Sequence, residues 1–393
     1  MTIKTQRKKS LTLAILFFIH GVVYASLVPW IPDIKEKFNL NNYMVGVMVS
    51  AIPAGSITFG LLSKRFINFI GLYWATSISF LCLIISTSIV SFSSSWYAIV
   101  LLLFLFGIFD SWGDTCINVQ AINIQKLYGR SLINRLHGAG SIGTIWGGLI
   151  AVSAIGFGLS MEKFSLAVLS INLIMLIIYI IYFRSTKIDN KFIPQRNTQQ
   201  DIKRLEKQLF TLALIILVFT CAIEETASIW GAIYMKDSYD VSSAVSGLPY
   251  LACQILMVVG RIFGDYFTNR FGRITILKCG ITLSALGVML IIAINSFVST
   301  ILGFSLIGLG ISVVFPLAIS FIGQLPNINA TSGITFATWM SRVGLLVAPP
   351  LIGMLADKTS LRISFLAIFI SCLVMLMLTN ILSSKLIKLN NGP

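Results

Sequence analysis

Five charged side chains interrupt long apolar stretches of this sequence, and they are where its chemistry is to be sought. They are Asp110, Asp114, Glu224, Glu225 and Arg342. An ionisable group in the middle of an apolar helix costs roughly 2.5–3.5 kcal/mol, so each one needs a compensating role. Carboxylates can take up and release protons, and the fork of an arginine matches a carboxylate or a phosphate.

The spacing of the first group places it on one helical face. Asp110, Asp114 and Asn118 follow one another at intervals of four residues, which is one turn of a helix. Two carboxylates one turn apart in a low dielectric repel each other, so one of them holds a proton or a cation lies nearby. The pattern predicts a proton or cation site; the alternative is a structural carboxylate bonded to a neighbouring helix.

The second group of charged residues contains two adjacent glutamates and an arginine. Glu224 and Glu225 are adjacent, so they point about 100° apart and only one can face a cavity directly. The other must pair with a neighbour or be protonated. Three roles are possible for Arg342: it binds an anionic substrate, it is a permanent counter-ion for Glu224, Asp114 or Asp110, or it lies near lipid headgroups.

Three further side chains are candidates beside these charges. His20 and Tyr24 lie one turn apart, and the histidine is either a proton relay or a buried imidazole with a single hydrogen bond. Trp230 either stacks on a substrate or packs in the core. None of the six cysteines forms a CxxC pair, so we expect no metal site and no cofactor.

The elements that carry these residues are transmembrane helices. The chain has 393 residues, of which 56% are hydrophobic and 11% charged, and its mean hydropathy is +0.89. So little charge cannot cover a water-facing surface, which excludes a soluble enzyme. Apolar runs between turn signals predict an all-α integral membrane protein with twelve spans. They are 11–31, 44–63, 70–91, 96–120, 132–156, 163–183, 208–233, 244–264, 273–294, 297–322, 330–355 and 361–384.

The cations indicate the orientation of the spans. If the N-terminus is cytoplasmic, 22 of the 29 Lys and Arg residues lie in inner segments and 6 in outer loops, and Arg342 lies within a span. This asymmetry predicts that both termini are cytoplasmic. The basic excess then reflects topology, and no nucleic-acid partner is needed to explain it.

The longest polar stretch divides the spans into two sets of six. Residues 184–207 carry seven cations and Pro194, which predicts a bundle over 1–183, a cytoplasmic linker over 184–207 and a second bundle over 208–393. The stretch from Gly60 to Gly71 and the stretch from Gly260 to Arg273 match weakly about 200 residues apart. Two parallel halves around a midplane site is a known plan of secondary transporters.

Several motifs resemble the major facilitator superfamily. Its cytoplasmic loop signature resembles Gly260-Arg-Ile-Phe-Gly-Asp265 followed by Arg270-Phe-Gly-Arg273. The resemblance implies a conformational latch made of Asp265 with Arg261, Arg270 and Arg273. Stretches around Asp114, Asn118, Glu224 and Ala348-Pro-Pro-Leu-Ile-Gly353 are similar to the fucose-permease-like branch. The branch usually has a small residue at Glu225 and an uncharged one at Arg342, so it supplies no role for either.

Taken together, these features predict a secondary active transporter with alternating access in the bacterial inner membrane. Its substrate would be a small polar solute, sugar-like or carboxylate-bearing, and the proton gradient its driving force, with Asp114 or Glu224 as the coupling carboxylate. We expect a monomer in the lipid bilayer and no enzyme activity, because no nucleophile–base pair is present. The alternatives are a drug or metabolite exporter and a membrane sensor or scaffold.

Overall fold

The chain folds into helices over the whole of its described length. The computed structural model describes residues 3–128, 133–183, 204–325, 328 and 330–390. It gives the backbone alone for residues 3–8, 125–128, 133–135, 265, 330–332 and 387–390. Within the described ranges there is no β-strand, and twelve helical segments are long and apolar enough to cross a membrane. The prediction of an all-α membrane protein with twelve spans is confirmed.

Internal contacts divide the chain into two compact units. The first unit comprises residues 1–38 and 51–194, and the second comprises residues 39–50 and 195–393. Helix α3 (Asn42–Phe59) therefore runs from the second unit into the first. Of the predicted linker, residues 184–203 lie outside the described part, and residues 204–207 are the first turn of a helix. The domain boundaries stay predictions.

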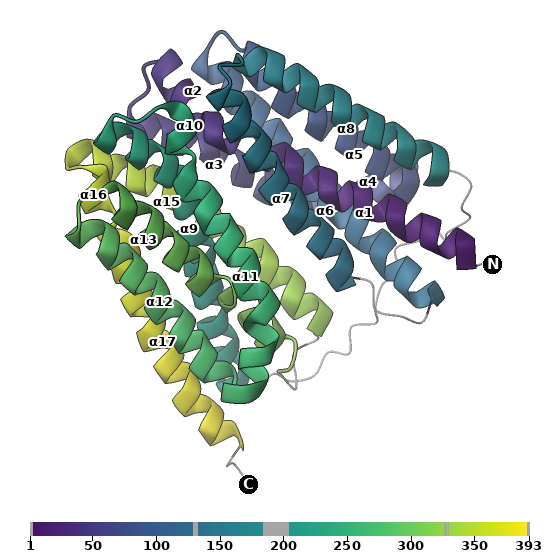
Figure 1. Cartoon of the computed structure of the whole chain (residues 1–393). Coiled ribbons are helices and arrows are strands. Elements are labelled where there is room, and N and C mark those ends of the chain that lie inside the picture. Colours follow the sequence, from purple (N-terminus) through teal and green to yellow (C-terminus); the bar gives the residue numbers. More distant parts are fainter. Residues whose placement is uncertain (1–2, 129–132, 184–203, 326–327, 329, 391–393) are drawn as a thin grey trace. The chain divides into compact units, whose positions relative to one another are not determined.

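The first unit is a bundle of long helices joined by short turns (Figure 1). Its elements are α1 (Ile3–Ala25), η1 (Val28–Trp30), α2 (Ile31–Lys37), η2 (Gly60–Leu62), α4 (Ser63–Ile70), α5 (Leu72–Ile89), η3 (Val90–Phe92), α6 (Trp96–Tyr128), α7 (Ile133–Gly156) and α8 (Met161–Phe183). Pro29 and Pro32 stand in the first turns of η1 and α2, where a missing backbone N–H costs nothing.

Glycines bring α1 and α7 into close contact. A Cβ atom at Gly143 would lie 2.2 Å from the carbonyl oxygen of Phe18, and one at Gly21 would lie 2.2 Å from that of Gly140. No side chain fits there, so the two backbones touch directly. Small residues serve this purpose in membranes, where helices gain little from burying apolar surface.

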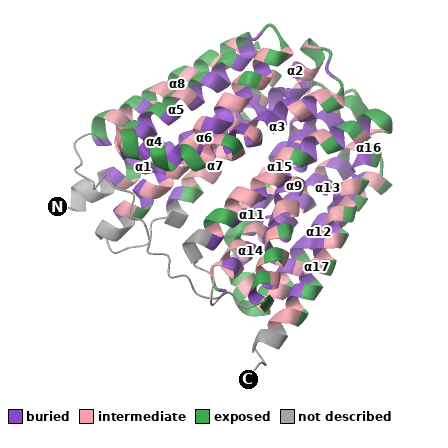
Figure 2. Cartoon of the chain, turned by 180° about the vertical axis from the view of Figure 1, so that it is seen from behind, coloured by how far each residue is buried: buried purple, intermediate pink, exposed green. Residues whose placement is uncertain are grey.

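Many large apolar side chains remain exposed along the outer faces of the helices. On α8, whose ribbon carries several exposed stretches in Figure 2, the exposed residues include Leu166, Ile171, Ile174, Ile177 and Ile181. A water-soluble protein seldom leaves so continuous an apolar surface open. The surface is suited to lipid, as the composition predicts.

The second unit is built from the remaining spans and three short segments that begin or complete them. Its elements are α9 (Arg204–Tyr239), α10 (Ser243–Ser246), α11 (Leu248–Phe271), α12 (Arg273–Ala293), α13 (Phe297–Ile311), α14 (Val314–Ile322), α15 (Ala330–Lys358), α16 (Leu361–Ser364) and α17 (Leu366–Asn390). Serines begin several of them: Ser296 and Ser299 form a capping box on α13, and Ser360 accepts the backbone N–H of Ile363 on α16. Such caps satisfy donors that the first turn leaves open.

The weak sequence repeat has a structural counterpart in the backbone. Gly71 links α4 to α5 with φ 83° and ψ 152°, and Gly272 links α11 to α12 with φ 85° and ψ 152°. This region is accessible almost only to glycine. Each N–H also closes the preceding helix, on Ile67 and Thr268 respectively. The same tight corner therefore occurs at matching places in the two motif copies.

Within the second unit, the first residues of α3 pack closely on α15. The Asp357 carboxylate accepts the backbone N–H groups of Asn42 at 2.9 Å and Tyr43 at 2.8 Å. A Cβ atom at Gly353 would lie 2.3 Å from the carbonyl oxygen of Asn42. Asp357 thus acts as the N-cap of α3 from another helix, and the negative charge suits the positive end of the helix dipole.

Candidate functional site

In the first unit, α1 and α6 bring together two of the candidate residues. Nε2 of His20 lies 2.9 Å from Oδ1 of Asp110, and about a quarter of each side chain is exposed. The ring of Phe80 lies 6.2 Å from that of His20 and covers one flank of the pair. A titratable base and an acid in direct contact can share a proton, so this pair can hold one inside the unit.

The second carboxylate of α6 has a different partner. Oδ1 of Asp114 accepts a hydrogen bond from the Asn118 amide at 2.9 Å, and the same amide donates to the Asp114 carbonyl at 2.9 Å. The predicted common face is therefore present, with Asn118 bonded to Asp114 one turn away. Asp110 lies against His20 and Asp114 accepts from Asn118, and each neighbour reduces the repulsion that the spacing of the two carboxylates implies.

Tyr24 lies one turn beyond His20 on α1. Its ring is 6.3 Å from that of Phe106 on α6, at a tilt of 34°. The predicted proximity of Tyr24 and His20 along one helix is thus accompanied by contacts of both with α6. The first unit holds its candidate residues on the facing sides of α1 and α6.

In the second unit, α9 and α11 carry an ion pair that sequence reasoning did not anticipate. Nη2 of Arg261 lies 3.6 Å from Oε1 of Glu224, with 41% and 30% of the side chains exposed. One turn further along α9, Ser228 accepts a hydrogen bond from the Gln254 amide at 3.3 Å. Arg261 is one of the cations that the family motif assigns to a latch, and here it faces the membrane carboxylate.

Arg342 lies close to this pair on a third helix. Gly344, two residues on, contacts α9 so tightly that a Cβ atom there would lie 2.0 Å from the Val218 carbonyl oxygen. Around Cys221, the charges of Glu224, Glu225 and Arg342 are all within electrostatic range. Yet Arg342 forms no ion pair or hydrogen bond with the described residues of the second unit.

The other candidates of the second unit lie deeper. Trp230 is completely buried, and in the described residues its indole nitrogen finds no hydrogen-bond partner. It has no surface with which to stack on a solute in this structure. Glu225 is half-buried on the same helix, α9, and lies within electrostatic range of Tyr250 on α11.

The remaining motif cations lie at the junction of α11 and α12. Arg270 donates to the Tyr266 hydroxyl at 3.2 Å and lies over the Phe271 ring. Arg273 donates to the side-chain oxygen of Gln324, just beyond α14. The side chain of Asp265 lies outside the described residues, so the predicted latch stays a prediction.

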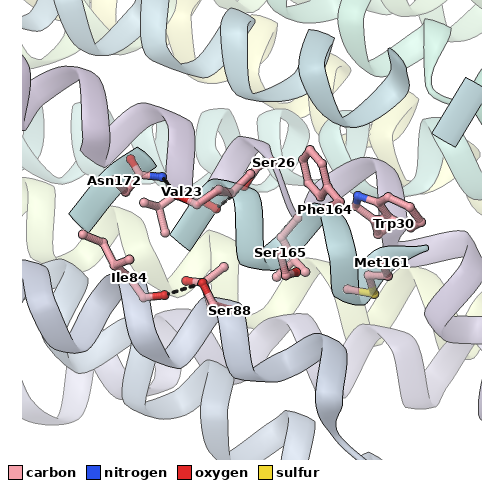
Figure 3. Close-up of a pocket in the computed structure, with 12 residues that line it drawn as sticks. Val23, Ser26, Trp30, Ile84, Ser88, Met161, Phe164, Ser165 and Asn172 are labelled. Atoms are coloured by element: carbon pink, nitrogen blue, oxygen red, sulfur yellow. Dashed lines mark hydrogen bonds between the residues drawn. The ribbon is translucent and has the colours of Figure 1, made fainter. Parts of the chain in front are cut away.

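The first unit also contains a small pocket between α1, α5 and α8, lined by apolar side chains and several hydroxyls (Figure 3). Its hydroxyls are bonded to their own helices, as Ser26 to Val23 and Ser88 to Ile84. The pocket volume is about 10 Å³, which is room for one water molecule at most. It is too small to be a solute site.

The described residues do not bring together side chains that could bind a metal ion. Among the described residues, no group of three or more His, Cys, Asp or Glu side chains is close enough to hold an ion. The carboxylates of both units can exchange protons, as can His20 in the first unit, and Arg261 and Arg342 in the second can recognise a negative charge.

Comparison with known families gives the fold its name. The sequence profile of the Major Facilitator Superfamily matches residues 13–327 and, again, residues 212–386. The chain belongs to that superfamily. The two overlapping matches also agree with the repeated Gly71 and Gly272 corners.

Relatives and solved structures of the superfamily extend over nearly the whole chain. The protein is 26% identical to an uncharacterized MFS-type transporter of Yersinia pestis, over 94% of this chain and 93% of that protein. It is 27% identical to the membrane protein MosC of Rhizobium meliloti, over 91% and 87%. A D-xylose–proton symporter structure superposes with a TM-score of 0.80 at 13% identity, covering 95% and 96% of the chains. The nucleoside transporter NupG gives a TM-score of 0.70 at 14% identity, covering 96% and 99%.

These comparisons confirm the predicted superfamily fold with twelve transmembrane helices in two six-helix halves. A likeness at such low identity concerns the fold. The superfamily assignment and the twelve spans indicate a multi-pass protein of the inner membrane.

Proposed function

We propose that this superfamily protein is a proton-coupled secondary transporter whose solute is small, polar and carboxylate-bearing. The observation that carries the proposal is the state of Arg342, a cation within a span that has no ion-pair or hydrogen-bond partner among the described residues of its own unit. A charge held in that position without a counter-ion is costly. A carboxylate on the solute would complete the pair and would bind in two parallel hydrogen bonds.

The alternative for Arg342 is a permanent counter-ion role. Glu224 instead lies against Arg261 at 3.6 Å, and Asp114 is bonded to Asn118. Glu224 therefore already has a cation beside it, Asp114 has a hydrogen-bond donor, and Asp110 lies against His20, which favours the solute as the partner of Arg342. Asp114 and Glu224 remain the proposed coupling groups, because a carboxylate in a span can be either charged or protonated. The neighbouring amide or guanidinium favours the charged form.

The proposed mechanism is alternating access in a monomer, with both termini cytoplasmic. The charges of α6 and α9 would change partners as the protein moves between its two states. Protonation of a carboxylate would release its donor and lower the cost of the rearrangement. The predicted latch of Asp265, Arg261, Arg270 and Arg273 would stabilise one of the states.

A sugar-like solute is the second candidate. Its support is the resemblance to the fucose-permease-like branch, together with folds shared with a D-xylose–proton symporter and a nucleoside transporter. A protein of the same fold could instead export drugs or metabolites from the cell, which is the third candidate.

Counterflow in proteoliposomes tests the choice of solute. The panel contains organic acids, their uncharged amide analogues, sugars and amines. We expect an organic acid to exchange, and Arg342→Gln to weaken its binding about 10- to 100-fold, which is the loss of a charge-assisted pair. Arg342→Lys is the matched control that keeps the charge. Exchange of sugars alone, unchanged by Arg342→Gln, would instead support the second candidate.

A further inference from the structure

The described part of the second unit contains a large apolar cavity. Its volume is about 560 Å³, within the range of roughly 300–1,000 Å³ that is typical of small-molecule sites. Its lining residues come from α9, α12, α14 and α17 and from the turns beside them. Apolar side chains from all four helices line it, among them Ile216, Leu277, Leu317, Phe321, Leu382 and Leu386.

One end of this cavity is polar and positive. Arg273 and Gln324 line it, and both side chains are exposed there. The first turn of α12, from Arg273 to Thr275, also borders the cavity, and Gly272 before it provides no side-chain cap. The arginine charge and the positive end of the helix dipole therefore act in the same direction and favour an anion at this end.

An apolar space of this size is poorly suited to water. The cavity is open at its polar end, where Arg273 and Gln324 are exposed, and its apolar walls lose packing contacts wherever no apolar group covers them. The ordinary remedy, collapse of the helices onto the gap, has not taken place around Ala213 and Ala318, whose small side chains line it. The apolar walls and the positive end of the cavity together fit an apolar ligand with an anionic head group.

We propose that this cavity binds a single-chain anionic amphiphile, a long-chain carboxylate of the fatty-acid class. The carboxylate would lie at Arg273 and the first turn of α12, and the chain would lie between α14 and α17. The positive charge of Arg273 at one end favours an anionic head group. No other charged side chain is among the described lining residues, which favours a plain hydrocarbon tail. This site does not include Arg342, and its only residue in common with the proposed transport machinery is Arg273, which also belongs to the predicted latch.

Photolabelling of the purified full-length protein in detergent tests the site. The probe is palmitate with a diazirine in the middle of its chain, and labelled peptides are mapped by mass spectrometry. We expect labelling of α14 and α17 around Phe321 and Leu382. Arg273→Gln should weaken probe binding about tenfold, and Ala318→Phe, which fills the cavity, should abolish this labelling.

The matched control is Arg270→Gln, which removes a cation three residues away that does not line the cavity. It should leave binding unchanged. If Ala318→Phe does not fold, Leu382→Phe fills the same space from α17. Labelling that survives both cavity-filling variants, equal losses in Arg270→Gln and Arg273→Gln, or displacement of the probe by phosphatidylglycerol but not by unlabelled palmitate would each overturn the proposal.

Discussion

At the scale of single residues, charged groups inside the spans are arranged as separate pairs. His20 contacts Asp110, Asn118 bonds Asp114, and Glu224 lies near Arg261. Each pair joins side chains of opposite or complementary character, so the energetic cost of placing them in an apolar helix is reduced. Arg342 stands apart from this arrangement, since it has no such partner among the described residues of the second unit.

The coupling carboxylates give the first prediction. Glu224→Gln and Asp114→Asn remove a titratable group while keeping its shape and hydrogen bonding. We expect both proteins to fold and to exchange solute, and at least one to lose uptake driven by a proton gradient. Gradient-driven uptake and counterflow are compared in the same proteoliposomes. Normal gradient-driven uptake in both variants would rule these carboxylates out as coupling groups.

The pair of His20 and Asp110 gives the second prediction. Replacing either side chain by alanine leaves the other half-buried without its partner, which costs about 1–3 kcal/mol of unfolding free energy. The double variant should cost about 1 kcal/mol less than the two single effects together, because the contact is lost only once. A double-mutant cycle on the unfolding free energy measures this. Strictly additive effects would show that the contact contributes nothing to stability.

At the scale of elements, close helix contacts hold each unit together. Gly143 on α7 meets the backbone of α1, and Gly344 on α15 meets that of α9. Other glycines in the same helices do not all have this role, because only some of them contact the backbone of a neighbouring helix. Gly138, in the same helix as Gly143, has nothing within 4 Å of the position a Cβ atom would take.

That difference between two glycines gives the third prediction. Gly143→Val forces α1 and α7 apart, and overpacking of this kind costs about 1–3 kcal/mol. Gly138→Ala should be neutral or stabilise the helix by up to about 1 kcal/mol. Thermal unfolding of the two purified variants compares them directly. A comparable loss of stability in both would mean that helix propensity, not the contact between helices, governs this helix.

At the scale of the whole molecule, the sequence predicted far more of the fold than of the site. Twelve spans follow from apolar length alone. The pairing of Arg261 with Glu224 could not be read from spacing, because it joins two helices whose packing depends on every residue between them. Burial of Trp230 is similar: an aromatic residue beside charges suits a cavity and a core equally well. The Asp357 cap on α3 joins positions more than 300 residues apart, which no local pattern indicates.

The central claim is that solute and protons move together and that Arg342 recognises the solute's carboxylate. The most direct test measures proton movement with a pH-sensitive dye inside proteoliposomes when an organic acid found by counterflow is added outside. We predict acidification of the interior with the native protein, a strongly reduced signal with Arg342→Gln and partial recovery with Arg342→Lys. Solute uptake without any change in internal pH, or an equal signal in the native protein and Arg342→Gln, would contradict the account.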